Sequence, residues 1–182
     1  MYATIVTTEE ELLQILELSK QNQKSGITEE ERKEQGFISW NYSIELLKKM
    51  HELHPNVIVK DGDKVAGYAL VAFKEARHFH PEMDHMIQSI DDIIYNGKPL
   101  SSYNYYVMGQ VCVDKAYRGK GIFDMLYLKH KELFQHRFDF VETEISTSNK
   151  RSVRAHERIG FKTIETHRDE KDEWSIVVWN WQ

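Results

Sequence analysis

A short run of glycines and basic residues near the middle of the chain has the composition of an anion-binding turn. Arg118, Gly119, Lys120 and Gly121 follow an apolar segment and lead through Ile122 and Phe123 into a helical pattern. A glycine-rich turn at the start of a helix leaves backbone N–H groups unpaired where the helix dipole favours negative charge. Residues 118–123 therefore predict either a pyrophosphate cradle or a tight connection with solvated basic side chains.

A second motif, later in the chain, makes the first more specific. The segment Val111-Cys112-Val113-Asp114 precedes the turn, and Asn149 is followed by His156-Glu157-Arg158-Ile159-Gly160-Phe161. In this order the segments resemble the GCN5-related N-acetyltransferase superfamily: the turn is similar to its Arg/Gln-x-x-Gly-x-Gly/Ala acyl-CoA signature, and the later segment to Asn…Tyr-Glu-Lys-x-Gly-Phe. Phe123 departs from Gly/Ala and is expected to point into the core. His156 replaces the usual tyrosine, as in a version that resembles the phosphinothricin-type acetyltransferases.

The resemblance implies a fold, a cofactor and a set of binding residues. The expected class is α/β (α+β), with a central mixed, mostly antiparallel sheet flanked by helices and a helical insertion before the cofactor-binding strand. Acetyl-CoA is the implied acyl donor. Its pantetheine arm would pair with the backbone of Val111 and Val113, and residues 118–123 would hold the pyrophosphate. Asn149 would reach the arm, although asparagine is equally natural there as a helix N-cap.

Two titratable residues are candidates for the chemistry. Transfer from a thioester to an amine needs a neutral amine and a protonated or solvated leaving thiolate. Glu144, at the end of a predicted strand, resembles in its placing the base of the ribosomal-protein N-terminal acetyltransferases; Glu142 shares its face by alternation and is the alternative. His156 could protonate the thiolate, or could be a packed histidine.

Two other chemistries are disfavoured by the pattern. Cys112 would alternate away from the face that Val111 and Val113 present, which argues against an acyl-cysteine intermediate. His78, His80 and His85 match no common zinc spacing, so no metal is expected. The turn also lacks the Walker A ending and the third glycine of a dinucleotide fingerprint, which argues against nucleotide hydrolysis and hydride transfer.

Composition and charge narrow the class of protein further. The 182 residues fit a single N-acetyltransferase domain over residues 1–182, with an insertion at about 76–102 and 41% hydrophobic residues to form its core. A net charge of −5 without a basic stripe gives no sign of a nucleic-acid partner. The single cysteine fits a reducing compartment, and no stretch reaches membrane-spanning length, so a soluble, cytoplasmic protein is expected.

Local patterns predict the elements that must position these residues. Thr8 and Glu11 form a capping box for a first helix, which runs to about Lys20, and Asp61-Gly62-Asp63 is the turn of a hairpin. The other expected helices begin near Ser43, span Pro81 to Tyr95, follow the glycine turn, and span Asn149 to Ile159. The expected strands are Tyr2 to Thr7, Asn56 to Lys60, Lys64 to Lys74, Tyr103 to Val113, Phe138 to Ile145, Phe161 to Thr166 and Trp174 to Trp181.

The sequence thus predicts acetyl transfer to a primary amine of a small molecule, directly in a ternary complex. Residues 75–106 would form a lid over the amine, with Phe79, Tyr103, Tyr105 and Tyr106; alternatively this segment completes the core or forms a dimer interface. A protein or peptide N-acetyltransferase and a non-catalytic acyl-CoA sensor are the competing functions. A homodimer is open, with the strand Trp174 to Trp181 as a candidate interface.

Overall fold

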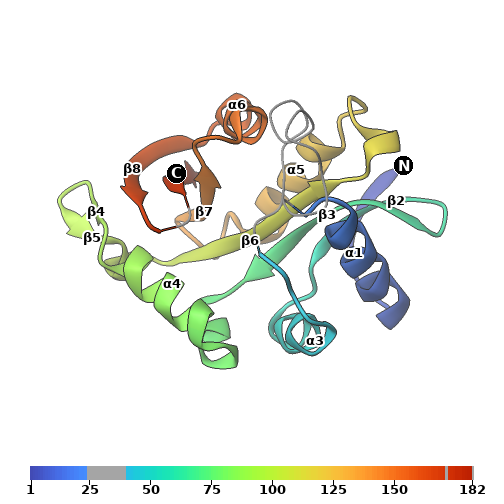
Figure 1. Cartoon of the computed structure of the whole chain (residues 1–182), viewed down its shortest axis with the longest axis horizontal. Helices are drawn as coiled ribbons and strands as arrows, with labels where there is room; N and C mark the ends of the chain where they lie inside the picture. Colours follow the sequence, from blue (N-terminus) through green and yellow to red (C-terminus); the bar gives the residue numbers. More distant parts are fainter. Residues whose placement is uncertain (24–39, 171, 182) are drawn as a thin grey trace.

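A seven-stranded sheet in the order β1-β2-β3-β6-β7-β9-β8 forms the centre of the molecule (Figure 1). The structure is a computed structural model that describes residues 1–23, 40–170 and 172–181. Neighbouring strands are antiparallel except β6 and β7, which run parallel. The strands are β1 (Tyr2–Ile5), β2 (Val57–Asp61), β3 (Lys64–Ala72), β6 (Tyr105–Val113), β7 (Phe140–Ser146), β8 (Lys162–Arg168) and β9 (Glu173–Asn180).

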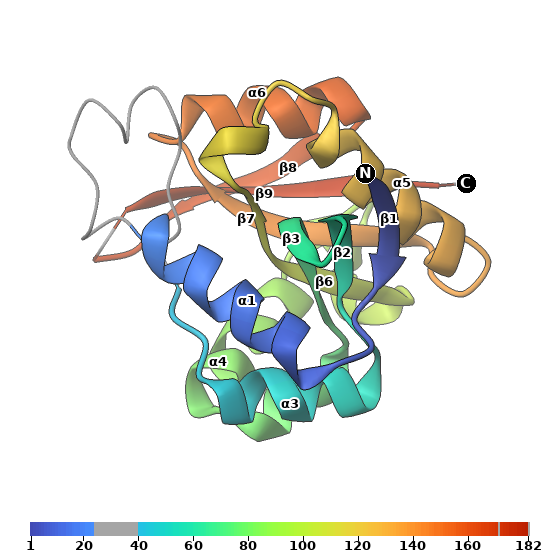
Figure 2. The same ribbon diagram turned by 90° about the vertical axis from the view of Figure 1, so that its right-hand side faces the viewer.

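Helices cover both faces of this sheet. Figure 2 shows α1 (Glu9–Gln21), α3 (Ile44–Leu53) and α4 (Pro81–Asp91) on one face, and α5 (Ile122–Phe134) and α6 (Lys150–Ile159) on the other. Each layer buries its own apolar cluster against the sheet. The α1 side includes Ile15, Leu47, Met50 and Tyr68, and the α5 side includes Val59, Leu126, Tyr127 and Phe134. The predicted fold class is therefore confirmed.

The first helix and the hairpin have the local chemistry that the sequence predicts. The Thr8 hydroxyl accepts from the Glu11 N–H at 3.2 Å, and the Glu11 carboxylate accepts from the Thr8 N–H at 3.2 Å. Gly62 has a φ of 59°, as the tight turn between β2 and β3 requires. The polar segment that follows the first helix lies largely outside the described residues.

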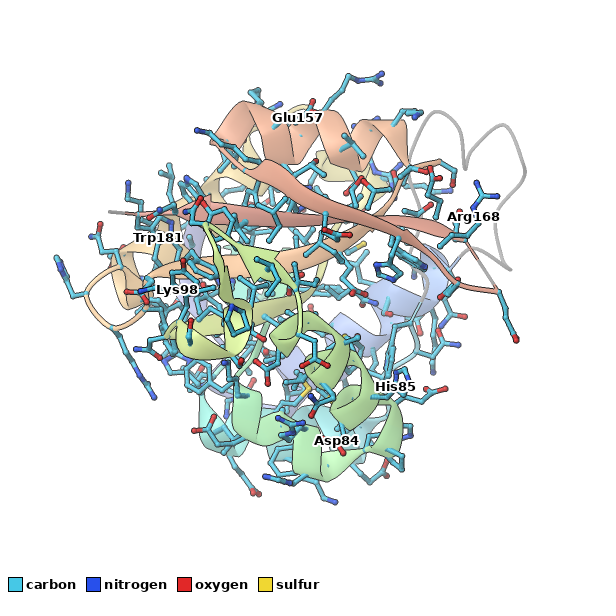
Figure 3. The ribbon with its side chains drawn as sticks, turned by 90° about the vertical axis from the view of Figure 1, so that its left-hand side faces the viewer. Asp84, His85, Lys98, Glu157, Arg168 and Trp181 are labelled. Carbon is cyan, nitrogen blue, oxygen red and sulfur yellow. The ribbon has the colours of Figure 1, made fainter. Side chains whose placement is uncertain are left out.

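The prediction for the insertion is wrong at the end of its helix. Its helix ends at Asp91 rather than Tyr95, and a short hairpin of β4 (Ile94–Tyr95) and β5 (Lys98–Pro99) follows. Asn96 and Gly97 both have positive φ, at 50° and 79°, because Asn-Gly favours a tight hairpin turn over continued helix. Ile94, which the predicted helix would have included, is 62% exposed on this hairpin. Figure 3 looks onto the insertion, with Lys98 on the hairpin and Asp84 and His85 on α4.

Hydrogen bonds and ion pairs of Asp91 link the insertion to the rest of the fold. This carboxylate, 8% exposed, accepts from Lys74 at 3.0 Å, from the Tyr105 hydroxyl at 2.9 Å and from Arg77 at 3.4 Å. The insertion also buries Met83, Ile87, Ile90 and Leu100. These contacts favour the core-completing alternative, and the lid stays a prediction.

The last strand does not lie at an edge of the sheet. β9 pairs with β7 on one side and with β8 on the other, so the backbone of residues 174–180 is already engaged. Its backbone edges are paired within the sheet, and its use as a homodimer interface stays a prediction. None of the helices among the described residues combines the length and apolar character needed to cross a membrane.

Candidate active site

The two parallel strands separate partway along their length and form a fork. β6 and β7 pair from Tyr105 opposite Phe140 to Val107 opposite Glu142. One further contact, from the Thr143 hydroxyl to the Met108 carbonyl at 2.9 Å, marks the apex. Beyond it the strands continue without a shared ladder. Strand edges opened inside a sheet present N–H and C=O groups to which an extended ligand can bind as an added strand.

Val111 and Val113 present such groups to the fork. The Asp114 N–H donates to the Ala66 carbonyl of β3 at 3.0 Å, so backbone alternation directs the groups of residues 111 and 113 the other way. In agreement, the Val113 carbonyl accepts from the Arg118 side chain at 3.3 Å. Both predicted binding positions therefore lie on the open edge.

The glycine turn has the conformation that an anion cradle needs. Gly119 and Gly121 have φ angles of 76° and 77°, which residues other than glycine rarely adopt. Gly121 is the N-cap of α5 and has no side chain with which to cap the first N–H groups of the helix. A Cβ atom built at either glycine would meet nothing within 4 Å, so the space beside the turn is open. The turn fits a pyrophosphate.

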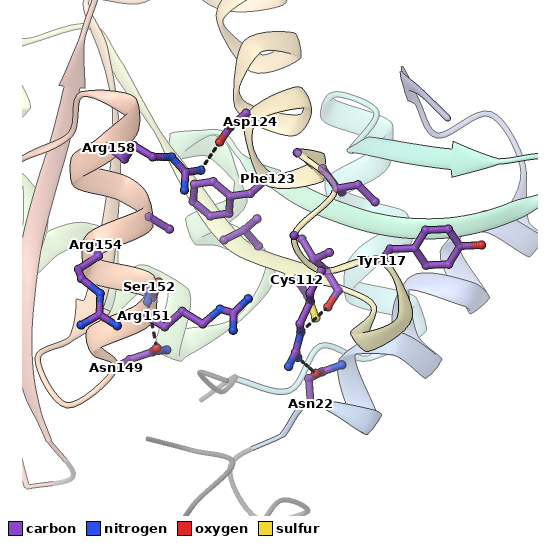
Figure 4. Close-up of a pocket in the computed structure, with 17 residues that line it drawn as sticks. Asn22, Cys112, Tyr117, Phe123, Asp124, Asn149, Arg151, Ser152, Arg154 and Arg158 are labelled. Atoms are coloured by element: carbon purple, nitrogen blue, oxygen red, sulfur yellow. Dashed lines mark hydrogen bonds and ion pairs between the residues drawn. The ribbon is translucent and has the colours of Figure 1, made fainter. Parts of the chain in front are cut away.

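A cleft of about 740 Å³ joins the fork, the glycine turn and one face of α6 (Figure 4). This size suits a cofactor-sized ligand. Arg151, Arg154 and Arg158 line it from α6, and Arg151 reaches across it. The spacing i, i+3, i+7 puts these arginines on one side of the helix. The cleft is therefore rich in positive charge, as phosphate groups require.

Sequence reasoning missed two contributors to this cleft. The arginines of α6 were detectable from their helical spacing. Asn22, at the end of α1, was not, because its place depends on the fold. Its side-chain oxygen accepts from Arg118 at 2.7 Å and ties the glycine turn to α1.

Phe123 lies between α5 and α6 and lines the cleft, rather than pointing only into the core. Its ring packs 4.9 Å from the ring of Tyr127 and 5.0 Å from that of His156. The two departures from the family pattern are in contact.

His156 is buried among these rings with both nitrogens hydrogen-bonded. Nδ1 is 2.8 Å from the Ser152 carbonyl, so it carries the proton, and Nε2 accepts from the Tyr127 hydroxyl at 2.6 Å. Burial lowers the pKa of His156 to about 4, which keeps the ring neutral. Donating a proton to a thiolate would require these bonds to rearrange. The catalytic role of His156 stays a prediction.

Asn149 lies at the other end of α6 and lines the cleft. Its side-chain oxygen accepts from the Ser152 N–H at 3.2 Å, which is the N-cap contact. The capping alternative is thus present in the structure. Contact with the pantetheine arm stays a prediction, because the amide N–H₂ group is chemically independent of the capping oxygen.

Two carboxyl groups lie on the opposite face of the fork from the cleft helices. Glu144 is largely buried, and burial together with the charge of Asp169 raises its pKa to about 7. Glu142 is fully buried, and neither of its oxygens has a hydrogen-bond partner among the described residues. Burial, then the charge of Glu144, raises the pKa of Glu142 well above its usual value. A carboxyl that titrates near neutral pH is suited to act as a base.

The structure also shows the surroundings of Cys112, which is among the residues that line the cleft, and of His80. Cys112 is buried, and burial raises the pKa of its thiol to about 12, so it stays protonated at neutral pH. His80 caps α4 by accepting from the Glu82 N–H at 3.2 Å. Over the part of the chain that the structure describes, no three His, Cys, Asp or Glu side chains group as metal ligands.

A forked sheet, a glycine turn at a helix N-terminus and an arginine-lined cleft together suit an extended, phosphate-bearing ligand. The model of the acetyltransferase (GNAT) family matches residues 12–161, and the chain belongs to that family. No curated protein sequence matches this chain.

Solved structures with the same fold cover nearly all of the chain. The ribosomal-protein-S18-alanine N-acetyltransferase of Escherichia coli is 12% identical, with a TM-score of 0.64 over 98% of this chain and 92% of its own. The smu.2055 protein of Streptococcus mutans is 14% identical, with a TM-score of 0.68 over 100% of both chains. The yncA protein of Salmonella typhimurium, solved with acetyl-CoA, is 15% identical, with a TM-score of 0.63 over 100% and 95%.

Family membership fixes the general reaction. The chain is an acyltransferase that uses acetyl-CoA as its donor and acts on amines. The predicted enzyme class and cofactor are thereby confirmed. At 12% to 15% identity the solved structures support the fold alone, and they do not carry the identity of the amine.

Proposed function

We propose that this enzyme transfers the acetyl group directly to a primary amine of a small molecule in a ternary complex, with Glu144 as general base. The observation that carries the proposal is the carboxyl of Glu144, whose pKa is raised to about 7 on the face of the fork opposite the cofactor cleft. An amine that approaches from that face meets a base already matched to neutral pH.

The donor would be held on the other side of the fork. Residues 118–123 and the arginines of α6 suit the phosphates, and the backbone edges of Val111 and Val113 suit the pantetheine arm. Acetyl-CoA supplies an activated acyl carbon and a thiol leaving group when bound. Asn149 is proposed to steady the arm through its amide N–H₂ group while its oxygen caps α6.

The role of Glu144 follows from the protons that the amine must lose. An ammonium group must become neutral before its nitrogen can form a bond to the acyl carbon as the carbon–sulfur bond breaks. Glu144 takes the first proton, and the second proton leaves the nitrogen and ends on the sulfur. Glu142, whose pKa is raised well above its usual value by burial, stays protonated beside it. One carboxyl of the pair is thus free to act as the base.

The surroundings of the acceptor face support a small amine. Phe140, at the start of β7, packs against the rings of Tyr95, Tyr103 and Tyr105 at 5.9, 5.5 and 5.6 Å. Phe140 and Tyr105 are buried, whereas Tyr95 and Tyr103 are partly buried, so aromatic side chains lie beside the proposed acceptor face. A protein or peptide acetyltransferase is the second candidate, and a sensor that binds acetyl-CoA without turnover is the third.

An amine screen separates these functions. Wild type, Glu144→Gln and Glu165→Gln would be assayed for CoA release with a panel of amino acids, polyamines and short peptides. Glu165 is the matched control, because it lies in the same cross-strand row, opposite Ile176, but is exposed on β8. We expect turnover of a small amine that falls about 100-fold in Glu144→Gln and is unchanged in Glu165→Gln.

The other possible outcomes distinguish the competing functions. Turnover of peptides alone would overturn the small-molecule proposal. Calorimetric binding of acetyl-CoA, with ATP as the control, in the absence of turnover of any acceptor would identify a sensor. Equal turnover by Glu144→Gln and wild type would exclude Glu144 as the base.

A further inference from the structure

The strand that borders the fork carries a bulge at the point where the fork opens. β6 pairs with β3 so that Ala69 lies opposite Val111 and Val71 opposite Met108; two residues, Gly109 and Gln110, therefore face one on β3. The bulge directly follows Met108, whose carbonyl marks the apex. A ligand arm that starts at the glycine turn and passes Val113 and then Val111 reaches this bulge with its far end.

A tyrosine hydroxyl lies directly over the bulge. A Cβ atom built on Gly109 would be 2.7 Å from the hydroxyl oxygen of Tyr42, which precedes α3. Any side chain at position 109 would collide with this oxygen, so the absence of a Cβ atom at Gly109 is what leaves space for the Tyr42 hydroxyl. Tyr42 has no hydrogen-bond partner among the described residues, although its ring is partly buried and packs 6.1 Å from that of Trp40. The hydroxyl is therefore available to donate a hydrogen bond to a ligand.

The register places Tyr42 and Glu144 on the two sides of one opening. Val107 lies opposite Glu142 in the last pair of the parallel ladder, so Gly109 and Glu144 each lie two residues further on, one on each arm of the fork. Alternation keeps residues 142 and 144 on the same face of β7. That face is the one covered by α1 and α3, on which Tyr42 also packs. A hydroxyl and a carboxyl therefore flank the position where the acyl group must emerge.

We propose that the Tyr42 hydroxyl donates a hydrogen bond to the acyl oxygen of the donor thioester, and so acts as a catalytic hydrogen-bond donor. The inference rests on the proposed function. Tyr42 keeps its proton throughout; burial raises the pKa of its hydroxyl above the ordinary value, so the group stays a neutral donor across the working range. A donor fixed where negative charge develops on the oxygen stabilises the transition state more than the ground state.

Measurements of acetyl-CoA binding test the proposed role of Tyr42 independently of turnover. Calorimetry would compare acetyl-CoA with CoA, which has no acyl oxygen, on wild type and Tyr42→Phe. We expect the variant to bind acetyl-CoA about threefold more weakly, as befits one neutral hydrogen bond, and CoA unchanged. The ring is retained, so a thermal melt should match that of wild type. Equal changes for the two ligands, or none, would overturn the proposal.

Turnover with hydroxylamine supplies the kinetic test. Hydroxylamine is largely uncharged at neutral pH, so it has little need of Glu144. With this probe we expect Tyr42→Phe to lower kcat about 100-fold, with less effect on KM for acetyl-CoA. Tyr68→Phe is the matched control, because it removes a buried hydroxyl that already donates to Gln110 at 2.5 Å, and its kcat should be close to wild type. Equal kcat values for Tyr42→Phe and wild type would overturn the proposal.

A double-mutant cycle asks whether position 109 acts through the hydroxyl. Gly109→Ala should displace the Tyr42 oxygen and reproduce its loss of acetyl-CoA affinity relative to CoA. In the Tyr42→Phe background the added methyl meets only ordinary contacts, at 3.6 Å from Ala72 and 3.7 Å from the ring, so it should cost little more. Additive losses would contradict the proposal. If wild type acetylates no acceptor but the binding differences hold, the proposed function fails and the Tyr42 contact stands.

Discussion

Glu142→Gln is expected to stabilise the protein, and increasingly so as the pH rises. Glu142 is 0% exposed, and neither of its carboxylate oxygens has a partner among the described residues. A buried charge without a partner is costly, so the folded protein holds this carboxyl protonated. The unfolded chain has no such constraint and ionises it near 4.5. Glutamine matches the neutral acid in shape and does not titrate.

The magnitude follows from the difference in bound protons. Above pH 4.5 the unfolded state has lost a proton that the folded state keeps, so the free energy of unfolding falls as the pH rises. The fall is about 1.4 kcal/mol per pH unit until the raised pKa of the folded state is reached, and it is absent below the unfolded value. For a chain of this length, this corresponds to roughly 3–6 °C in Tm per unit.

Urea unfolding of wild type and Glu142→Gln between pH 4.5 and 7 measures this difference. The variant should equal wild type at the acid end and exceed it by about 1.4 kcal/mol more with each unit. Glu165→Gln, an exposed position on β8, should track wild type throughout. A constant difference between the Glu142→Gln and wild-type curves would refute the reasoning, because it would mean that Glu142 titrates alike in both states.

Three further predictions concern activity, cofactor binding and the insertion. Wild-type kcat/KM should rise with pH through about 7 as Glu144 ionises, and Glu144→Gln should lose that limb, so that the deficit of the variant is largest at high pH; a limb that persists in the variant would assign it to another group. Gly121→Val should weaken acetyl-CoA binding at least about 10-fold by calorimetry, because a β-branched residue does not adopt a φ of 77° and the turn must change shape; undiminished affinity would count against the cradle. Asp91→Ala should lower the free energy of unfolding by about 3 kcal/mol in urea, because Lys74, Arg77 and Tyr105 lose a buried acceptor; a loss below about 1 kcal/mol would show that the insertion is held by its apolar contacts alone.

Patterns confined to a few neighbouring residues predicted most of the elements. The capping box of Thr8 and Glu11, the turn at Gly62 and the helix that starts after Gly121 are all where the sequence puts them. Caps and tight turns depend on backbone geometry within one turn of chain, so nearby residues suffice to specify them. The helix of the insertion was predicted too long because the apolar periodicity continues to Ile94; the Asn96-Gly97 turn signal should have outweighed it.

Sequence by itself determined the family, because the glycine turn and the Asn149–Phe161 segment are contiguous motifs; phosphate binding by residues 118–123 stays a prediction. Only the tertiary structure decided what surrounds them. The fork opens after Glu142, His156 is enclosed by Tyr127, and the Tyr42 hydroxyl lies over Gly109. Each of these facts joins segments that are distant along the chain. Burial and hydrogen bonding set the pKa of a carboxyl and the freedom of an imidazole, and both are properties of packing that no local pattern contains.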